Sequence, residues 1–252
     1  MEQLIMVDAL KRASAKRITV VMPFYGYARQ DRKHRGREPI SGRLMAHLFK
    51  TAGANRQMAV DLHTAQIQRF FDGPVEHCGR AASAGRLRRR ALRDRTVVRG
   101  VPGRRVASGS RRCGVSGSPV RRLRFIHKTR DLNRPNEAVA NRVVGEVAGR
   151  TCVVVDDMID TGSTITKATD ALYAEGAAAV VITATHAVLS GPAVDRLKNC
   201  PVREVIVTNT LPISADQRFD KLTTLSIAPL IARAISEVFQ DGSVTSLFDG
   251  NA

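Results

Sequence analysis

The stretch that decides the fold runs from Val153 to Thr164 and reads Val-Val-Val-Asp-Asp-Met-Ile-Asp-Thr-Gly-Ser-Thr. A run of β-branched residues ends in two adjacent carboxylates, Asp156 and Asp157, and a loop of small residues then opens a helix. A short, continuous apolar run is typical of a strand in a parallel sheet that is covered on both faces. This order predicts an α/β fold that binds a ligand at the carboxyl end of the strand.

The loop from Asp160 to Thr164 has the chemistry of a phosphate site. The N–H groups of a first helical turn have no partner within the helix, and the helix dipole favours an anion there. Gly162 lets the backbone approach a ligand closely, and the hydroxyls of Thr161, Ser163 and Thr164 add donors. The two preceding carboxylates repel a phosphate and suit the hydroxyls of a sugar. We therefore expect a sugar-phosphate site; an ordinary helix start is the alternative.

Alternating strand and helix patterns extend from this loop in both directions, which predicts mostly parallel sheets. In the helix expected over residues 41–51, Leu44 and Leu48, with Met45 beside them, are expected to face the core. The expected strands cover residues 17–22, 57–62, 151–155, 179–183, 204–208 and 222–227, and the expected helices cover residues 4–13, 41–51, 164–175, 192–197 and 229–239.

Composition and cysteine spacing exclude several classes of protein. The 252 residues are 43% apolar, which is enough for a packed core, and the apolar runs are far shorter than a membrane span of about 20 residues. The start has neither the basic segment nor the small-residue cleavage site of a secretory signal, so we expect a cytoplasmic protein without a membrane partner. The four cysteines are widely spaced, which excludes zinc ribbons and thioredoxin-like sites.

The net charge of +17 is concentrated in residues 78–124, the Arg-rich segment. This segment holds 15 of the 40 basic residues but only one of the 23 acidic ones, Asp94. Its apolar residues follow neither a strand period nor a helix period. One interpretation is an arm that binds nucleic acid through phosphates, although the aromatic residues that would stack on bases are missing. The other, which we favour, is a stretch translated out of frame from GC-rich DNA.

Several further stretches, together with the loop, resemble one enzyme family, the ribose-phosphate pyrophosphokinases, whose ribose-phosphate loop is that of type I phosphoribosyltransferases. The resemblance implies two phosphoribosyltransferase-like domains and transfer of the diphosphoryl group of ATP to ribose 5-phosphate, giving phosphoribosyl pyrophosphate and AMP. It also implies Mg²⁺ as cofactor and a homo-oligomer. The stretches that carry it lie at residues 25–41, 60–63, 70–75, 153–164, 189–193, 207–210 and 243–248.

The resemblance also implies roles for individual residues. Lys128 and Arg130 match positions on a mobile catalytic loop that stabilises charge on the transferring phosphates. His63 matches a magnesium ligand, and the Asp-x-His spacing would place Asp61 on the same strand face. The ATP-binding positions are Arg29, Gln30 and Asp31, and those for ribose 5-phosphate are Arg130, Asp156, Asp157, Asp160, Thr161, Gly162, Ser163 and Thr164.

Two departures from the family stand out. The start resembles the middle of the first domain, so that residues 1–77 are expected to be a remnant of it, without the upstream stretch that holds the adenine of a neighbouring subunit's ATP. The Arg-rich segment replaces a helix, the first strand of the second domain and a Ser-Pro-Asp loop that binds magnesium-ATP. We expect this segment to be disordered and the second domain, residues 125–252, to lack its normal first strand.

Loss of a buried strand is costly, because apolar burial contributes about 25 cal/mol per Å² and net stability is only about 5–15 kcal/mol. We therefore expect ligand loops that are recognisable and catalysis that is poor or absent. Two other functions stay open at this point. One is a non-catalytic paralogue that binds nucleotide or co-assembles with an intact enzyme, and the other is a nucleic-acid binder that uses the Arg-rich segment.

Overall fold

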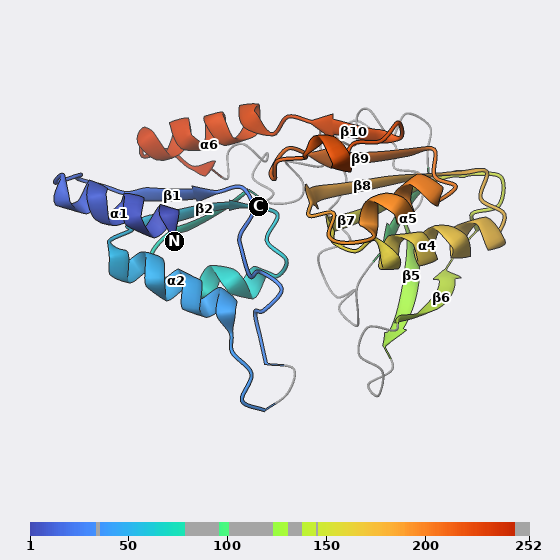
Figure 1. Ribbon diagram of the computed structural model, residues 1–252, viewed down its shortest axis with the longest axis horizontal. Coiled ribbons are helices and arrows are strands. Elements are labelled where there is room, and N and C mark those ends of the chain that lie inside the picture. The colour runs from blue at the N-terminus through green and yellow to red at the C-terminus, as the bar shows by residue number, and fades with distance from the viewer. Residues whose placement is uncertain (34–35, 79–95, 101–122, 131–137, 145, 245–252) are drawn as a thin grey trace. The chain divides into compact units, whose positions relative to one another are not determined.

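The computed structural model describes residues 1–33, 36–78, 96–100, 123–130, 138–144 and 146–244 (Figure 1). The chain divides into two compact units. The first unit contains the chain up to Ser83 and the later stretch Pro229–Gly250, and the second is built chiefly from Ala84–Ala228. The last helix is therefore grouped with the first unit, whereas the sequence placed it in a domain of residues 125–252.

The first unit contains a small parallel sheet with strand order β1-β2-β3. Thr19 of β1 pairs with Arg56 of β2, and Gln57 of β2 pairs with Val75 of β3. The sequence predicted β1 and β2 and the helix between them. The elements of this unit are α1 (Glu2–Arg12), β1 (Thr19–Met22), α2 (Ser41–Ala52), β2 (Arg56–Val60), the 3₁₀-helix η1 (Ala65–Arg69), β3 (Val75–Cys78) and α6 (Ala228–Phe239).

Helix α2 packs with a different face from the one predicted. Leu44 is 57% exposed and Leu48 is 39% exposed, whereas Gly42, Ala46 and Phe49 are buried. A Cβ on Gly42 would lie only 3.3 Å from the carbonyl oxygen of Tyr27, so the helix approaches its neighbours through small residues. Both faces of this helix carry apolar residues, and the sequence period alone did not show which one the sheet covers.

The second unit contains a seven-stranded sheet with strand order β10-β9-β8-β7-β4-β5-β6. Every neighbouring pair is parallel except β5 and β6. This confirms the expected α/β fold with mostly parallel sheets. Its elements are β4 (Thr96–Gly100), β5 (Leu123–Arg130), β6 (Ala138–Val144), β7 (Thr151–Ile159), α4 (Ser163–Ala174), β8 (Ala179–Ala187), α5 (Ala193–Asn199), β9 (Glu204–Thr208), the 3₁₀-helix η3 (Ala215–Gln217) and β10 (Leu222–Leu225).

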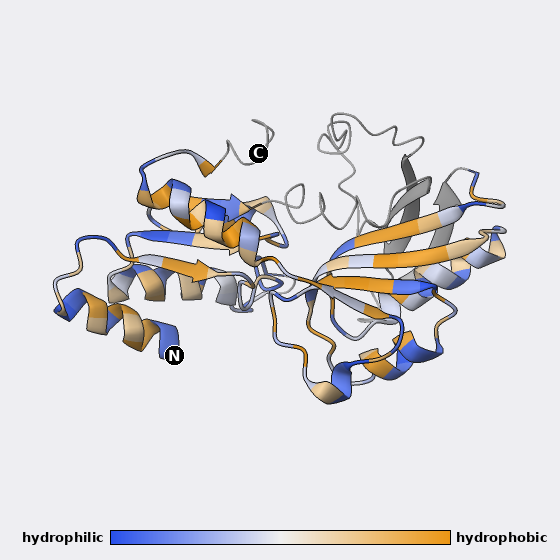
Figure 2. Cartoon of the chain, turned by 90° about the horizontal axis from the view of Figure 1, so that it is seen from above, coloured by the Kyte–Doolittle hydropathy of each residue, from blue (hydrophilic) through white to orange (hydrophobic). Residues whose placement is uncertain are grey.

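The central strands of this sheet are apolar on both faces, as their continuous apolar runs predicted (Figure 2). On one face, Val154 of β7 joins a core that includes Ile165 and Leu172 of α4. On the opposite face, Val153 packs with its neighbours on β8 and β9. The core therefore holds β7 rigidly up to the residues that open the predicted sugar-phosphate loop.

One expectation for the second unit is wrong. The Arg-rich segment supplies a strand, β4, which lies between β7 and β5 in the sheet. Val97 of β4 pairs with Val153 on one side and with Leu123 on the other. A short β-branched run is sufficient to form this strand. Its backbone hydrogen bonds are made with the two neighbouring strands, so they do not depend on the flanking side chains. The remainder of residues 79–122 lies outside the described residues, so the expected disorder is not addressed.

The described helices include none that is both long enough and apolar enough to span a membrane.

Candidate sugar-phosphate site

The predicted loop connects β7 to α4 as the sequence indicated. Strand β7 ends at Ile159, and Gly162 adopts a left-handed conformation (φ 75°) immediately before the first helical residue, Ser163. Ser163 itself has a helical backbone and needs no left-handed conformation. Among the described residues, no side chain caps α4. The N–H of Ile165 donates to the carbonyl of Gly162 at 3.1 Å, and the N–H groups that precede it in the turn have no side-chain cap, so they can face an anion.

Helix α5 braces this loop from one side. The Nη1 atom of Arg196 donates a 2.9 Å hydrogen bond to the carbonyl oxygen of Thr161. The Cα atom of Ala193 would lie 3.7 Å from a Cβ on Gly162, which is an ordinary van der Waals distance. The backbone N–H of Ser190 donates to the carbonyl oxygen of Asp160 at 3.1 Å. Sequence reasoning missed Arg196, because a single arginine in a helix carries no signal of a bond to a distant carbonyl.

The loop hydroxyls lie close together. The Oγ atoms of Thr161 and Ser163 are 3.4 Å apart, and Thr161 is exposed. Thr166 donates its hydroxyl back to the carbonyls of Gly162 and Ser163, at 3.2 and 3.1 Å, and so stabilises the first turn. Thr164, half-buried, belongs to the same turn. The structure therefore brings the predicted loop residues together as a set of donors.

The two acids lie within β7 and do not follow its end as expected. The strand continues to Ile159, and Asp156 pairs with Ala184 of β8. The backbone N–H of Asp157 donates to Oδ1 of Asp156 at 3.0 Å, and both residues are at most 9% exposed. Since neighbouring residues of a strand alternate in direction, the two carboxylates belong to opposite faces of the strand tip.

The candidate ATP residues lie in the first unit, in the loop between β1 and α2. Arg29 and Gln30 are exposed on a loop whose backbone is fixed to α2. The N–H of Gly42 donates to the carbonyl of Gln30 at 3.1 Å, and the hydroxyl of Tyr25 donates to the carbonyl of Gly42 at 2.8 Å. Burial raises the pKa of Tyr25 to about 12, so its hydroxyl stays a donor at neutral pH.

Asp31, the third candidate for ATP, is 6% exposed and makes bonds within the protein. Its Oδ2 atom accepts hydrogen bonds of 2.6 Å from the hydroxyl of Thr64 and from Nε2 of Gln66. Gln66 also donates to its carbonyl oxygen at 3.2 Å. Asp31 thus ties the loop that carries Arg29 to the turn that follows β2. Neither Thr64 nor Gln66 was indicated by the sequence.

The predicted metal ligands do not share a strand face, and that part of the prediction is wrong. Strand β2 ends at Val60, and Asp61 has a left-handed backbone (φ 44°), so the strand period does not reach His63. Asp61 is buried, its N–H donates to the carbonyl of Cys78 at 3.0 Å, and His63 is half-buried. The described part of the chain shows no group of three or more His, Cys, Asp or Glu side chains suited to a metal ion.

A second histidine shapes this turn. The N–H of Leu62 donates to Nε2 of His77 at 3.0 Å. Nδ1 lies 3.3 Å from the side-chain amide of Gln68. His77 therefore holds the backbone between the two candidate metal ligands. The sequence did not single it out, because only the pairing of β2 with β3 brings it to Leu62.

Lys128 and Arg130 lie in strand β5 and not in a loop, which corrects the placement that the resemblance implied. Lys128 pairs with Ala140 and Arg130 with Ala138 in the antiparallel hairpin of β5 and β6. The register shifts between Ile126 and Lys128, and such bulges are frequent near functional sites.

Comparisons with known proteins cover the whole chain. A family model described as the phosphoribosyl synthetase-associated domain matches residues 86–249, and one for the N-terminal domain of ribose phosphate pyrophosphokinase matches residues 1–53. The ribose-phosphate pyrophosphokinase of Mycobacterium tuberculosis is 60% identical over 253 residues, which cover 100% of this chain and 77% of that protein. The chain belongs to the ribose-phosphate pyrophosphokinase family.

Other members of the ribose-phosphate pyrophosphokinase family agree with this assignment. The enzyme of Streptomyces coelicolor is 59% identical over 250 residues, covering 99% of this chain and 76% of its own. The crystal structure of phosphoribosylpyrophosphate synthetase from Mycobacterium smegmatis matches with a TM-score of 0.83 and 55% identity, over 96% of this chain and 78% of that one. The chain is thus a ribose-phosphate diphosphokinase by family, a class of transferase that depends on Mg²⁺.

Proposed function

We propose that ribose 5-phosphate binds at the loop between β7 and α4, with its phosphate on the first turn of α4. The uncapped start of this helix is the observation that carries the proposal. Gly162 and the hydroxyls of Thr161, Ser163 and Thr164 would surround the phosphate, and Asp160 closes the loop.

The acids at the strand tip complete this site. Asp156 and Asp157 would accept hydrogen bonds from the ribose hydroxyls, since like charges keep them away from the phosphate. Their places on opposite strand faces allow each to meet a different part of the sugar.

In the same proposal, ATP binds through the exposed side chains of Arg29 and Gln30. The backbone of the loop that carries them is hydrogen-bonded to α2. Asp31 contributes by holding this loop against the turn after β2, where Asp61 and His63 lie. This arrangement supports a common site for the nucleotide and the metal ion, because the hydrogen-bonded carboxylate of Asp31 restrains both the loop after β1 and the turn after β2.

Asp61 and His63 would hold Mg²⁺ together with the phosphates of ATP. Mg²⁺ is usually bound by one or two carboxylates plus substrate phosphates and water, so a partial protein site of this kind fits the ion. When bound, the ion would neutralise charge on the phosphates. The imidazole of His63 is the less typical ligand, and Asp61 is the oxygen donor of the pair.

Lys128 and Arg130 would stabilise the negative charge on the transferred diphosphoryl group, and Arg130 would also contact ribose 5-phosphate. The anomeric hydroxyl of the sugar attacks the β-phosphorus of ATP, and AMP leaves. Catalysis of this kind consists mainly of positioning and charge stabilisation, so no side chain acts as a covalent nucleophile.

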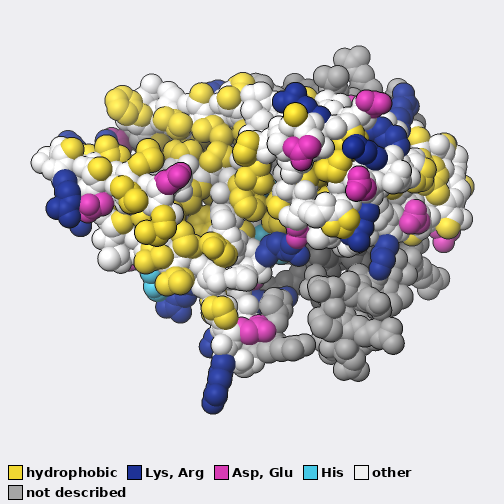
Figure 3. All heavy atoms as spheres, viewed as in Figure 1, with side chains coloured by type: hydrophobic (Ala, Val, Ile, Leu, Met, Phe, Trp, Pro, Cys, Tyr) yellow, Lys and Arg dark blue, Asp and Glu magenta, His cyan; other side chains and the backbone are white. Residues whose placement is uncertain are grey.

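We also propose that the first unit mediates a homo-oligomer. Large apolar side chains are exposed on its helices, and Figure 3 shows hydrophobic side chains gathered on this unit. A patch of this kind on a folded protein marks an interaction site. The exposed large apolar side chains are Ile5, Met6 and Leu10 of α1, Leu44 and Leu48 of α2, and Ile235 and Phe239 of α6.

Cysteine chemistry supports a cytoplasmic location. Cys78, Cys152 and Cys200 are free and buried, and burial raises the pKa of the Cys78 and Cys152 thiols to about 11. Thiols that are protonated and covered in this way suit a reducing compartment.

Titration calorimetry tests the sugar-phosphate site. Ribose 5-phosphate should bind the wild-type protein at least tenfold more tightly than ribose, because the phosphate supplies the contacts to α4. The change Asp157→Asn should weaken binding of both sugars by a similar factor. Equal binding of ribose and ribose 5-phosphate would show that the loop is not a phosphate site.

A further inference from the structure

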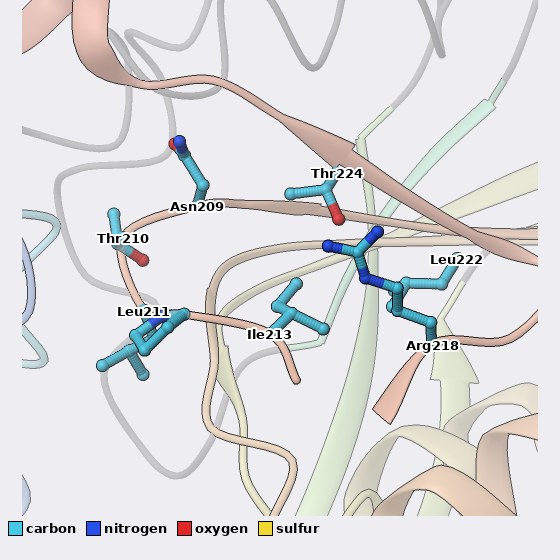
Figure 4. Close-up of a pocket in the computed structure, with 8 residues that line it drawn as sticks. Asn209, Thr210, Leu211, Ile213, Arg218, Leu222 and Thr224 are labelled. Carbon is cyan, nitrogen blue, oxygen red and sulfur yellow. The ribbon is translucent and has the colours of Figure 1, made fainter. Parts of the chain in front are cut away.

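A cavity lies at the carboxyl edge of the large sheet. It has a volume of about 660 Å³, within the range typical of small-molecule sites. Its residues come from the segment that follows β9, from the loop around η3, and from β10 (Figure 4). None of them is among the candidate residues for ribose 5-phosphate, ATP or magnesium.

Three polar side chains that line this cavity carry hydrogen-bond donors; we call them the polar rim. They are the guanidinium group of Arg218, the hydroxyl of Thr224 and the amide nitrogen of Asn209. Within the described part of the chain, none of the three donors has a side-chain hydrogen bond or ion pair. In Figure 4 the Arg218 guanidinium extends toward the Thr224 hydroxyl, so the two donors face the same space.

The rest of the cavity is largely apolar. Leu211, Ile213 and Leu222 line it, and we call them the apolar floor. Leu222 and Thr224 lie two residues apart on β10 and therefore share one face of the strand. The cavity thus offers one positively charged group and neutral donors beside an apolar surface, and its lining includes no carboxylate.

Arg218 is held in place through its backbone and not through an ion pair. A capping box stabilises η3: the Ser214 side chain binds the start of the helix and Gln217 binds back to Ser214. Gln217 also donates to the carbonyl of Leu189 at 3.5 Å. On the other side, Lys221 donates to the carbonyls of Lys198 and Cys200, at 3.0 and 2.8 Å. The loop is therefore preorganised, which lowers the entropic cost of binding a ligand.

Asn209 is oriented in a similar way. Its Oδ1 atom accepts a 2.8 Å hydrogen bond from the N–H of Ile227, and its own N–H donates to the carbonyl of Leu225 at 3.1 Å. With the oxygen engaged, the amide presents its NH₂ group as a donor. The Asn209 amide is thus oriented as a donor and the Arg218 guanidinium is always one, and together with the Thr224 hydroxyl they suit an anion.

We propose that this cavity binds a small organic anion, with its phosphate or carboxylate on the polar rim and its uncharged part on the apolar floor. The planar guanidinium of Arg218 matches the oxygens of either group in a bidentate pair. The volume exceeds that of an inorganic ion, so the ligand has an apolar or cyclic portion of up to about nucleotide size. This site does not depend on the proposed function of the sugar-phosphate loop.

Chemical-shift titration of the full chain with phenyl phosphate, benzoate, phenol and inorganic phosphate tests the proposal. Phenyl phosphate or benzoate should shift the amide signals of residues 209–211, 213, 218 and 222–224, and the tighter of the two identifies the preferred anionic group. Each should bind at least tenfold more tightly than phenol. The proposal is overturned if the shifts are confined to residues 160–164, or if inorganic phosphate binds as tightly as phenyl phosphate.

Substitutions in the polar rim test which side chains contribute to binding of the anion. Arg218→Gln should weaken binding of the better anion about tenfold and leave phenol unchanged, and Thr224→Val should weaken it about threefold. Arg203→Gln, which removes an exposed arginine outside the cavity, is the matched control and should have no effect. All three positions are exposed, so the variants should fold. Equal losses of affinity in Arg218→Gln and Arg203→Gln would show that the effect comes from net charge alone and would refute the site.

Discussion

The Oδ2 atom of Asp31 and the hydroxyl of Thr64 lie 2.6 Å apart, in a hydrogen bond that connects two loops 33 residues apart in the chain. The first loop carries Arg29 and Gln30, and the second follows Asp61 and His63. A half-buried bond to a carboxylate contributes about 1.5–3 kcal/mol. This contact therefore gives the proposed ATP and magnesium residues a fixed relation to each other.

Breaking this contact should affect both stability and nucleotide binding. We expect Asp31→Ala to lower the free energy of unfolding by about 2–3 kcal/mol, because it strands the donors of Thr64 and Gln66. Thr64→Val should cost about 1.5 kcal/mol. Urea unfolding of both variants and of the double variant measures the coupling. Fully additive losses would mean that the two side chains do not stabilise each other.

The buried tyrosine of the same loop predicts a pH dependence. The pKa of Tyr25 is raised to about 12 by burial, above its ordinary value of 10, so the folded state favours the neutral phenol. Its contribution is fully present below pH 10 and is lost as the pH rises from 10 through 12. We expect Tyr25→Phe to cost about 1 kcal/mol at pH 8, and this difference from the wild type to shrink above pH 10 and to reverse sign before pH 12, since a pKa of about 12 in place of 10 corresponds to a loss of about 2 kcal/mol. A difference that stays constant over this range would contradict the prediction.

A change in the sugar-phosphate loop should affect both the stability of the protein and the binding of ribose 5-phosphate, and a control glycine separates the two effects. Gly162→Ala should lower the free energy of unfolding by about 1–2 kcal/mol, because a φ of 75° is strained for alanine although space for the Cβ exists. It should also weaken the binding of ribose 5-phosphate at least threefold, as measured by titration calorimetry.

Gly149→Ala is the matched control for this change. Gly149 has a φ of 67° and open space around it, but it lies outside the loop. We expect a similar loss of stability and unchanged binding of ribose 5-phosphate. Weaker binding in both variants would assign the effect to stability and not to the loop.

Turnover should be lower than in the relatives of the family. The resemblance implies a Ser-Pro-Asp loop that binds magnesium-ATP, and no residue of the Arg-rich segment matches its aspartate. We expect AMP release from ATP with ribose 5-phosphate to be at least a hundredfold slower than for the Mycobacterium tuberculosis relative, measured side by side. Equal rates would show that other residues supply this role.

A prediction also follows for the oligomer. Replacing Leu44 and Leu48 together by Ser should lower the molar mass seen by light scattering, because both side chains are exposed and contribute little to the core of their own unit. Phe49→Ser, on the buried face of the same helix, should instead unfold the unit. An unchanged mass in the first variant would exclude this face of α2 from the interface.

The amino-acid sequence by itself was sufficient for the α/β class, for the loop from Asp160 to Thr164, and for most strands and helices outside the Arg-rich segment, although it did not predict β3, β5 or β6. These features are local: a β-branched run, a glycine before a helix and hydroxyl residues at its start carry their meaning within about a dozen residues. The same local signals carried the resemblance to the family, which the comparisons confirmed.

Only the tertiary structure decided which apolar face of α2 is buried, that Asp31 binds Thr64, and that Arg196 braces Thr161. It also showed that the Arg-rich segment contributes β4, since two neighbouring strands pair with its backbone. Each of these depends on contacts between residues far apart in the chain. Such contacts are set by how sheets and helices pack, and no pattern within a single segment records them.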